Sequence, residues 1–137
     1  DYITNHQATN CIYSAQIISL QDLSIDHFLP WSFVAHDQLW NLVPTTKAVN
    51  SSKNNSLPKL DIYFNAFAKL QFNAFLWHFE KRKLKVLEDY SLLFRKEESE
   101  IARFSPHQFQ QHVSEHISPL MQIASNLGFP QNWTYRL

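Results

Sequence analysis

Five polar residues between positions 26 and 53 have types and an order that can support hydrolysis. An Asp-His pair at Asp26 and His27 is followed by Asn41, Asn50 and Lys53. Metal-assisted hydrolysis needs a base that activates the attacking water and a cation that neutralises the negative charge that develops during the reaction. An imidazole changes its charge close to neutral pH, and carboxylate and amide oxygens are ligands for hard cations. These residue types are the ones that metal-assisted hydrolysis needs.

The order and intervals of these residues resemble the HNH nuclease motif. Asn41 comes fourteen residues after His27, and Asn50 comes nine residues after Asn41 within the run Asn-Ser-Ser-Lys. The specific resemblance covers residues 11–58. It implies a ββα-metal finger that hydrolyses phosphodiester bonds, and four polar positions at matched intervals are far more specific than a lone histidine.

The resemblance implies a role for each residue. His27 would be the general base, and Asp26 and Asn50 would be the metal ligands. Asn41 would support the histidine, either by orienting its imidazole or by holding the backbone around it, and Lys53 would be a point charge beside the scissile phosphate. With asparagine at its third position the motif is an H-N-N variant. Its all-oxygen ligand set favours Mg²⁺ or Mn²⁺ over Zn²⁺.

One feature of many HNH proteins is missing from this sequence. Two Cys-x-x-Cys pairs that hold a structural zinc should fall at Cys11 and Ser14 and at Thr46 and Val49, and only Cys11 is a cysteine. One thiolate with three such partners cannot form a tetrahedral zinc site, so we predict no structural zinc. The finger would then be held by apolar packing, with the candidates Ile12, Ile25, Leu29, Trp31, Leu42 and Val43, and Cys11 would be a small buried residue.

The sequence predicts an α+β fold, with a small ββα finger packed against a mainly helical C-terminal part. Short strands are expected at residues 23–25 and 41–43, with a helix that presents Asn50. Helical periodicity predicts helices over residues 60–83 and 84–95. A third helix starts at a capping box formed by Ser105 and Gln108, is broken or kinked by Pro119, and ends near Gly128. The tail is expected to fold back on the helices. Residues 1–58 would form the nuclease motif and residues 59–137 the helical part of the same domain.

Composition limits the cellular setting and the partners. The single cysteine forbids an internal disulfide, which agrees with a cytoplasmic location. No uncharged apolar stretch approaches the ~18 residues of a membrane span, so no membrane partner is expected. The net charge is zero, whereas dedicated nucleic-acid binders are usually basic. The lysines around the motif, Lys47, Lys53 and Lys59, are the best candidates for phosphate contacts.

DNA is the expected partner, and the sequence does not choose among four settings: restriction, anti-phage defence, a mobile element or a phage product. The chain starts at Asp1, which suggests an upstream targeting domain. A single HNH site cuts one strand, so cleavage of both strands would need a homodimer or repeated nicking. Two alternatives stay open: a non-catalytic nucleic-acid- or protein-binding module with a degenerate HNH fold, and an HNH nuclease acting on RNA. Taken singly, Asn41 also fits a turn, and residues 50–56 also fit an ordinary polar loop.

Overall fold

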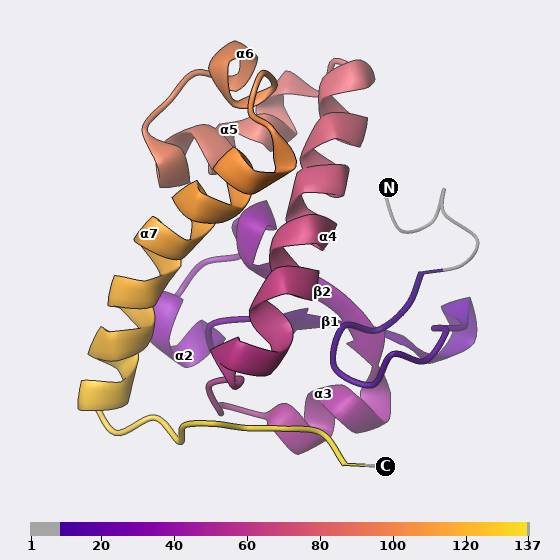
Figure 1. The fold of residues 1–137 in the computed structure, drawn as a ribbon. Helices are drawn as coiled ribbons and strands as arrows, with labels where there is room; N and C mark the ends of the chain where they lie inside the picture. The colour runs from indigo at the N-terminus through magenta and orange to yellow at the C-terminus, as the bar shows by residue number, and fades with distance from the viewer. Residues whose placement is uncertain (1–8, 137) are drawn as a thin grey trace.

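A two-stranded antiparallel sheet and one helix form the N-terminal unit of the structure. The computed structural model describes residues 9–136 (Figure 1). The predicted nuclease motif (residues 1–58) and helical part (residues 59–137) therefore extend beyond the described residues, at residues 1–8 and at residue 137. Strand β1 (Leu23–His27) pairs with β2 (Leu42–Thr46), and Asp26 lies opposite Val43. Helix α3 (Lys47–Lys53) follows β2 directly. The predicted ββα order is present, with longer strands than expected.

Short helical turns surround the strands. A 3-10 turn η1 (Leu20–Asp22) precedes β1, helix α2 (Trp31–Val34) follows it, and a second turn η2 (Leu39–Asn41) leads into β2. The connection between the strands therefore consists largely of short helical turns. It brings Asn41 back beside the end of β1, where the Phe28 backbone N–H donates to the Asn41 carbonyl at 2.8 Å.

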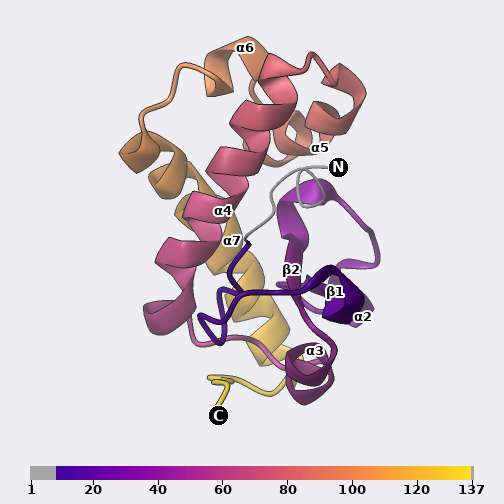
Figure 2. The same ribbon diagram turned by 90° about the vertical axis from the view of Figure 1, so that its right-hand side faces the viewer.

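Four helices make up the C-terminal part. They are α4 (Leu60–Glu80), α5 (Leu84–Phe94), α6 (Glu98–Ile101) and α7 (Pro106–Asn126). Figures 1 and 2 show α3 and the C-terminal tail at one end of the molecule and α6 at the other, with α4 and α7 running between them. The α+β fold predicted from the sequence is confirmed. The sequence did not predict α6.

Helix α4 joins the two parts because its buried face contacts both. Phe67 is fully buried and stacks on Phe28 at a centroid distance of 3.9 Å, just after β1. One turn further on, Gln71 Nε2 donates to the Leu42 carbonyl of β2 at 2.8 Å. The Gln71 Oε1 atom accepts from the Tyr90 hydroxyl of α5 at 2.7 Å. These contacts hold the two-stranded sheet against α4 and, through Gln71, against α5.

Helix α7 begins as the sequence predicted and continues without a break past Pro119. Ser105 and Gln108 form the reciprocal capping box. The expectation that Pro119 breaks the helix is wrong, because α7 is one continuous helix to Asn126, whereas a kink at Pro119 stays a prediction. Pro119 is exposed, so the carbonyl that loses its intrahelical partner can bind water, and the buried Ile117 and Met121 hold the helix on either side. Gly128 follows with φ +98°, the left-handed conformation that glycine adopts easily.

The C-terminal tail folds back, as predicted. The Leu57 N–H donates to the Pro130 carbonyl at 2.7 Å, and the Trp133 N–H donates to the Leu57 carbonyl at 2.9 Å. Trp133 also meets the Tyr13 ring edge-on at 5.2 Å. The tail therefore ties the loop after α3 to the N-terminal segment.

Two of the residues predicted to hold the finger by packing do not do so. Leu29 and Val43 are fully buried, whereas Ile25 is 41% exposed and Trp31 is 53% exposed. Ile25 faces solvent because it alternates with the buried Asp26 along β1. Within residues 9–136, no helix combines the length and the apolar character needed to span a membrane.

Candidate active site

Helix α3 presents two polar side chains to strand β1. Its first turn is capped by Thr46, whose hydroxyl accepts from the Val49 N–H at 3.3 Å. Asn50 and Lys53 are three residues apart, so they lie on the same face of this helix. Asn50 reaches Ser24 and Lys53 reaches Asp26, two residues that share one face of β1.

The side-chain amide of Asn50 is held by its nitrogen. Nδ2 donates to Ser24 Oγ at 2.8 Å and lies 3.4 Å from the Ile25 carbonyl oxygen. Because the carbonyl can only accept, it fixes which end of the amide faces the strand. Within the described part of the chain, Oδ1 of Asn50 has no hydrogen-bond partner. The lone pairs of Asn50 Oδ1 are therefore available to bind a cation or a hydrogen-bond donor.

Asp26 is buried and surrounded by donors. Its side chain accepts a 2.6 Å hydrogen bond from the Tyr13 hydroxyl at Oδ2. Lys53 Nζ lies 3.2 Å from Oδ2 and 3.3 Å from Oδ1 of the same carboxylate, and it also donates to the His27 carbonyl at 2.7 Å. A carboxylate has about four lone-pair positions, so these contacts leave acceptor capacity on Asp26.

Burial dominates the electrostatics of this cluster. It raises the pKa of the Asp26 carboxyl, and the Lys53 ammonium and the Tyr13 hydroxyl offset part of that rise. Burial also lowers the pKa of Lys53, and the Asp26 carboxylate opposes that change. The pKa of Tyr13 is raised by its burial first and by the neighbouring Asp26 charge second. Each charge is thus stabilised mainly by its partner, as in other buried ion pairs.

Lys53 does not lie where the sequence predicted. Its side chain is completely buried, and its ammonium group contacts Asp26 and the His27 backbone instead of facing a phosphate. The physical reason is its position on α3, which directs it inward toward a carboxylate that would otherwise be buried without a counter-charge. Lys47, at the start of the same helix, is exposed.

His27 ends β1 and holds its imidazole partly open to solvent. Nε2 lies 2.7 Å from Asp37 Oδ1, and the His27 side chain is 25% exposed. Nδ1 has no partner among residues 9–136. One ring nitrogen is thus bound to a carboxylate and the other is available to a water or a substrate.

Asn41 holds the backbone beside His27 rather than its ring. Its Oδ1 accepts from the Leu29 N–H at 2.8 Å, and its Nδ2 donates to the Leu29 carbonyl at 2.9 Å. Asn41 is fully buried, so these bonds satisfy polar groups that water cannot reach. Of the two ways in which Asn41 could support His27, its position matches the second.

One open cavity of about 300 Å³ brings three of the five candidate residues together. It is lined by Asp26, His27 and Asn50, together with Ile25, Pro30, Trp31, Ser51, Asn54 and Asn55. The donor set fits a hard cation, because the lining offers a carboxylate and an unpaired amide oxygen. Mg²⁺ commonly takes only one or two ligands from the protein and keeps several waters. No group of three or more His, Cys, Asp or Glu side chains within residues 9–136 offers an alternative metal centre.

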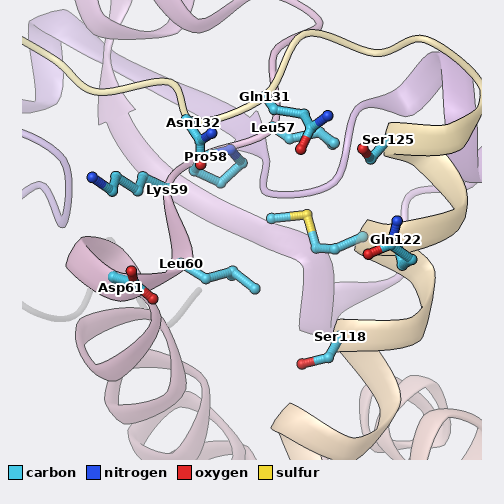
Figure 3. Close-up of a pocket in the computed structure, with 11 residues that line it drawn as sticks. Leu57, Pro58, Lys59, Leu60, Asp61, Ser118, Gln122, Ser125, Gln131 and Asn132 are labelled. Carbon is cyan, nitrogen blue, oxygen red and sulfur yellow. The ribbon is translucent and has the colours of Figure 1, made fainter.

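A second cavity, also of about 300 Å³, shares no lining residue with the first. Figure 3 shows Lys59 and Asp61 at the start of α4, Gln122 and Ser125 on α7, and Gln131 in the tail. These side chains come from three segments that meet where the tail folds back. None of the five motif residues lies there, so this cavity plays no part in the candidate site.

The segments where zinc-binding cysteines would fall are packed together. Cys11 is 1% exposed and its Sγ lies 3.1 Å from Thr45 Oγ1. A turn around Cys11 is closed by its N–H donating to the Gln16 carbonyl at 2.8 Å. Val49, at the position of the fourth expected ligand, is also buried. Cys11 is a small buried residue, as predicted.

The sequence analysis missed two residues of the site. Tyr13 contacts Asp26 across 13 positions of sequence, and Asp37 contacts His27 across ten. Tyr13 lies just after Cys11 inside the recognised segment, which was the only signal that could have drawn attention to it. Asp37 lies in an irregular loop where spacing carries no information about contacts.

Residues 11–59 match the family model described as HNH endonuclease. The matched segment includes all five motif residues. The whole chain has 137 residues. No curated protein and no solved structure matches the chain. The segment 11–59 is therefore similar to HNH endonucleases, and the resemblance inferred from the motif is confirmed.

Proposed function

We propose that this chain is a divalent-metal-dependent endonuclease that hydrolyses DNA phosphodiester bonds. The HNH segment supports a nuclease, and one observation supports the proposed chemistry most directly. His27, Asp26 and the unpaired Oδ1 of Asn50 line the same open cavity. The proposed base and the two proposed oxygen ligands thus line one cavity that is open to a substrate phosphate.

Each residue has a step that its position allows. His27 Nδ1 takes a proton from a water molecule, and the resulting hydroxide attacks phosphorus while the bond to the 3′ oxygen breaks. A Mg²⁺ or Mn²⁺ ion held by Asp26 and Asn50 would supply charge stabilisation at the phosphate and at the leaving oxygen. Lys53 and Tyr13 fix the Asp26 carboxylate, and Asn41 fixes the backbone after His27. These contacts set the ligand and the base in place before substrate binds.

DNA is proposed as the substrate because the cavity is open and its rim suits a polynucleotide. Trp31 is more than half exposed beside the site, and a base can stack on such a ring. Lys47 is exposed on α3, the helix that also carries Asn50. With a net charge of zero, the chain would bind nucleic acid weakly by itself.

Nicking of supercoiled plasmid tests this function. Purified protein is incubated with Mg²⁺, Mn²⁺ or EDTA, and a matched single-stranded RNA and DNA pair is treated in parallel. The proposal predicts metal-dependent conversion of supercoiled to relaxed plasmid by the wild-type protein. His27→Ala should lose that activity by about 100-fold or more, the usual contribution of a general base.

The matched control is His107→Ala, which removes an exposed histidine on α7. It should nick at the wild-type rate, so that any loss in His27→Ala reflects its place in the cavity. Equal activity of His27→Ala and wild type would overturn the proposed mechanism. Cleavage of the RNA strand alone would overturn the assignment to DNA.

A further inference from the structure

Asp37 makes a contact that the HNH motif does not account for. Its Oδ1 lies 2.7 Å from Nε2 of His27, at the short end of the range for a hydrogen bond between a ring nitrogen and an oxygen. A carboxylate accepts such a bond, so the ring nitrogen that faces it must carry a proton. In a neutral imidazole this leaves Nδ1 unprotonated. The base is thereby set in the tautomer that the proposed reaction needs.

The Asp37 side chain is 73% exposed, so its own surroundings do not hold it in place. The loop around it does. The Leu39 N–H donates to Asp89 Oδ2 of α5 at 2.7 Å, and the Gln38 N–H donates to His36 Nδ1 at 3.2 Å. The backbone directly after Asp37 is therefore fixed, at Gln38 and at Leu39.

The loop has a buried anchor as well. Trp40 is 3% exposed, and its indole N–H donates to Gln38 Oε1 at 2.6 Å. Its ring also meets the His36 imidazole edge-on at 5.5 Å. A carboxylate on such a loop loses less conformational freedom when it binds His27 than one on a free loop would.

We propose that Asp37 is the positioning residue for His27, and that Asp89 of α5 holds the loop that presents it. The contribution of Asp37 to catalysis rests on the proposed nuclease function. Its effect on the tautomer of His27 does not depend on that function. During the reaction the water proton moves to Nδ1, and the imidazolium formed keeps its Nε2 proton hydrogen-bonded to Asp37. The helical part of the chain thus helps to arrange the HNH site.

The tautomer can be measured without any substrate. Imidazole ¹⁵N chemical shifts are recorded on the ¹⁵N-labelled chain, and the His27 signals are assigned among the seven histidines by their loss in His27→Gln. The proposal predicts that His27 in the wild type carries its proton on Nε2. In Asp37→Asn the amide can donate to Nε2 instead, so the proton should shift toward Nδ1. Asp22→Asn, which changes another exposed carboxylate, should leave the signals unchanged.

Cleavage kinetics give the second measurement. Asp37→Asn should lower kcat by about 10- to 100-fold, the range typical of a residue that orients a functional ligand. The KM for plasmid and the affinity for Mn²⁺ should stay unchanged, since Asp37 lines neither the cation site nor the cavity. Asp37→Glu should recover part of the loss, because it restores the carboxylate. Asp89→Ala should give a smaller loss and mixed tautomers.

The two measurements separate the inference from the function on which it builds. A tautomer that depends on Asp37 in a chain without nuclease activity would support the positioning contact and reject the proposed function. An active nuclease in which Asp37→Asn changes neither the His27 signals nor kcat would overturn the inference and leave the function intact.

Discussion

Lys53 and Asp26 form an ion pair inside the ββα unit, with Nζ of the lysine 3.2 Å from Oδ2 of the aspartate. Lysine rarely occurs completely buried unless it is paired, and here the pair is completed by Tyr13 and the His27 carbonyl. The contact joins α3 to β1 and sets the carboxylate that is proposed to bind the cation. Lys53 consequently holds the Asp26 carboxylate from inside the protein and is not exposed to a substrate.

Replacement of Lys53 should destabilise the fold. Lys53→Met leaves the Asp26 carboxylate buried without its counter-charge, which costs about 3–5 kcal/mol of unfolding free energy. Lys47→Met changes an exposed lysine on the same helix and should leave stability nearly unchanged. Urea denaturation followed by circular dichroism measures both.

A double variant checks the cause of that loss. Asp26→Asn removes the unpaired charge, so adding it to Lys53→Met should restore part of the stability. If Lys53→Met and Lys47→Met were equally stable, the buried ion pair would be no part of the fold.

Loss of the Asn41 side chain should also weaken the protein. Asn41→Ala leaves the buried N–H and carbonyl of Leu29 without partners, and each such group costs roughly 1–3 kcal/mol, so we expect a loss of about 2–6 kcal/mol of unfolding free energy. Asn73→Ala, at an exposed position of α4, is the matched control. Urea denaturation should show a lower midpoint for Asn41→Ala alone. A midpoint equal to that of the control would contradict this role.

His78 should make stability depend on pH. It is 4% exposed, and its Nδ1 donates to the Ala74 carbonyl at 2.7 Å. Burial lowers its pKa, the Ala74 carbonyl opposes this, and the Lys83 charge lowers it further. Above the ordinary histidine pKa of about 6.5 both states are neutral. Below it the unfolded chain takes up a proton that the folded chain excludes, so the unfolding free energy falls as the pH falls.

The measurement is a series of urea titrations between pH 7.5 and pH 5, which are chosen to lie on either side of the ordinary histidine pKa of about 6.5. His78→Gln should lose less stability over this range than the wild type, because its side chain does not titrate. His107→Gln, at an exposed position, should follow the wild-type curve. Parallel curves for wild type and His78→Gln would show that His78 does not cause the dependence.

The sequence predicted the parts of the fold that local patterns determine. The order β1, β2, α3 followed from the motif, and α7 followed from its capping box. It also identified His27, Asp26 and Asn50, which line one cavity, although their roles stay predictions. These features depend on residues that lie close in sequence or on intervals that the family shares.

The sequence could not show contacts that only the folded chain creates. Tyr13 reaches Asp26 because the N-terminal turn packs against β1, and Asp37 reaches His27 because Asp89 holds an irregular loop. Lys53 was expected beside the scissile phosphate because the resemblance to the motif implies that role for it, three residues beyond Asn50. Its burial depends on a carboxylate 27 positions away in the chain.

The central claim is that Asn50 holds the cation and His27 activates the water, and Mn²⁺ binding measured beside plasmid nicking tests it most directly. Free Mn²⁺ is followed by electron paramagnetic resonance for wild type, His27→Ala, Asn50→Ala and the control Asn55→Ala, which changes an exposed residue of the same cavity. Asn50 is preferred to Asp26 because the ion pair with Lys53 makes Asp26 important for stability.

The two functions should separate in these variants. His27→Ala should bind Mn²⁺ like the wild type and nick about 100-fold more slowly or worse. Asn50→Ala should bind Mn²⁺ at least ~10-fold more weakly, since a direct ligand should contribute no less than the residues that support one. It should also lose nicking activity. Wild-type Mn²⁺ affinity in Asn50→Ala, or wild-type nicking by His27→Ala, would contradict the account.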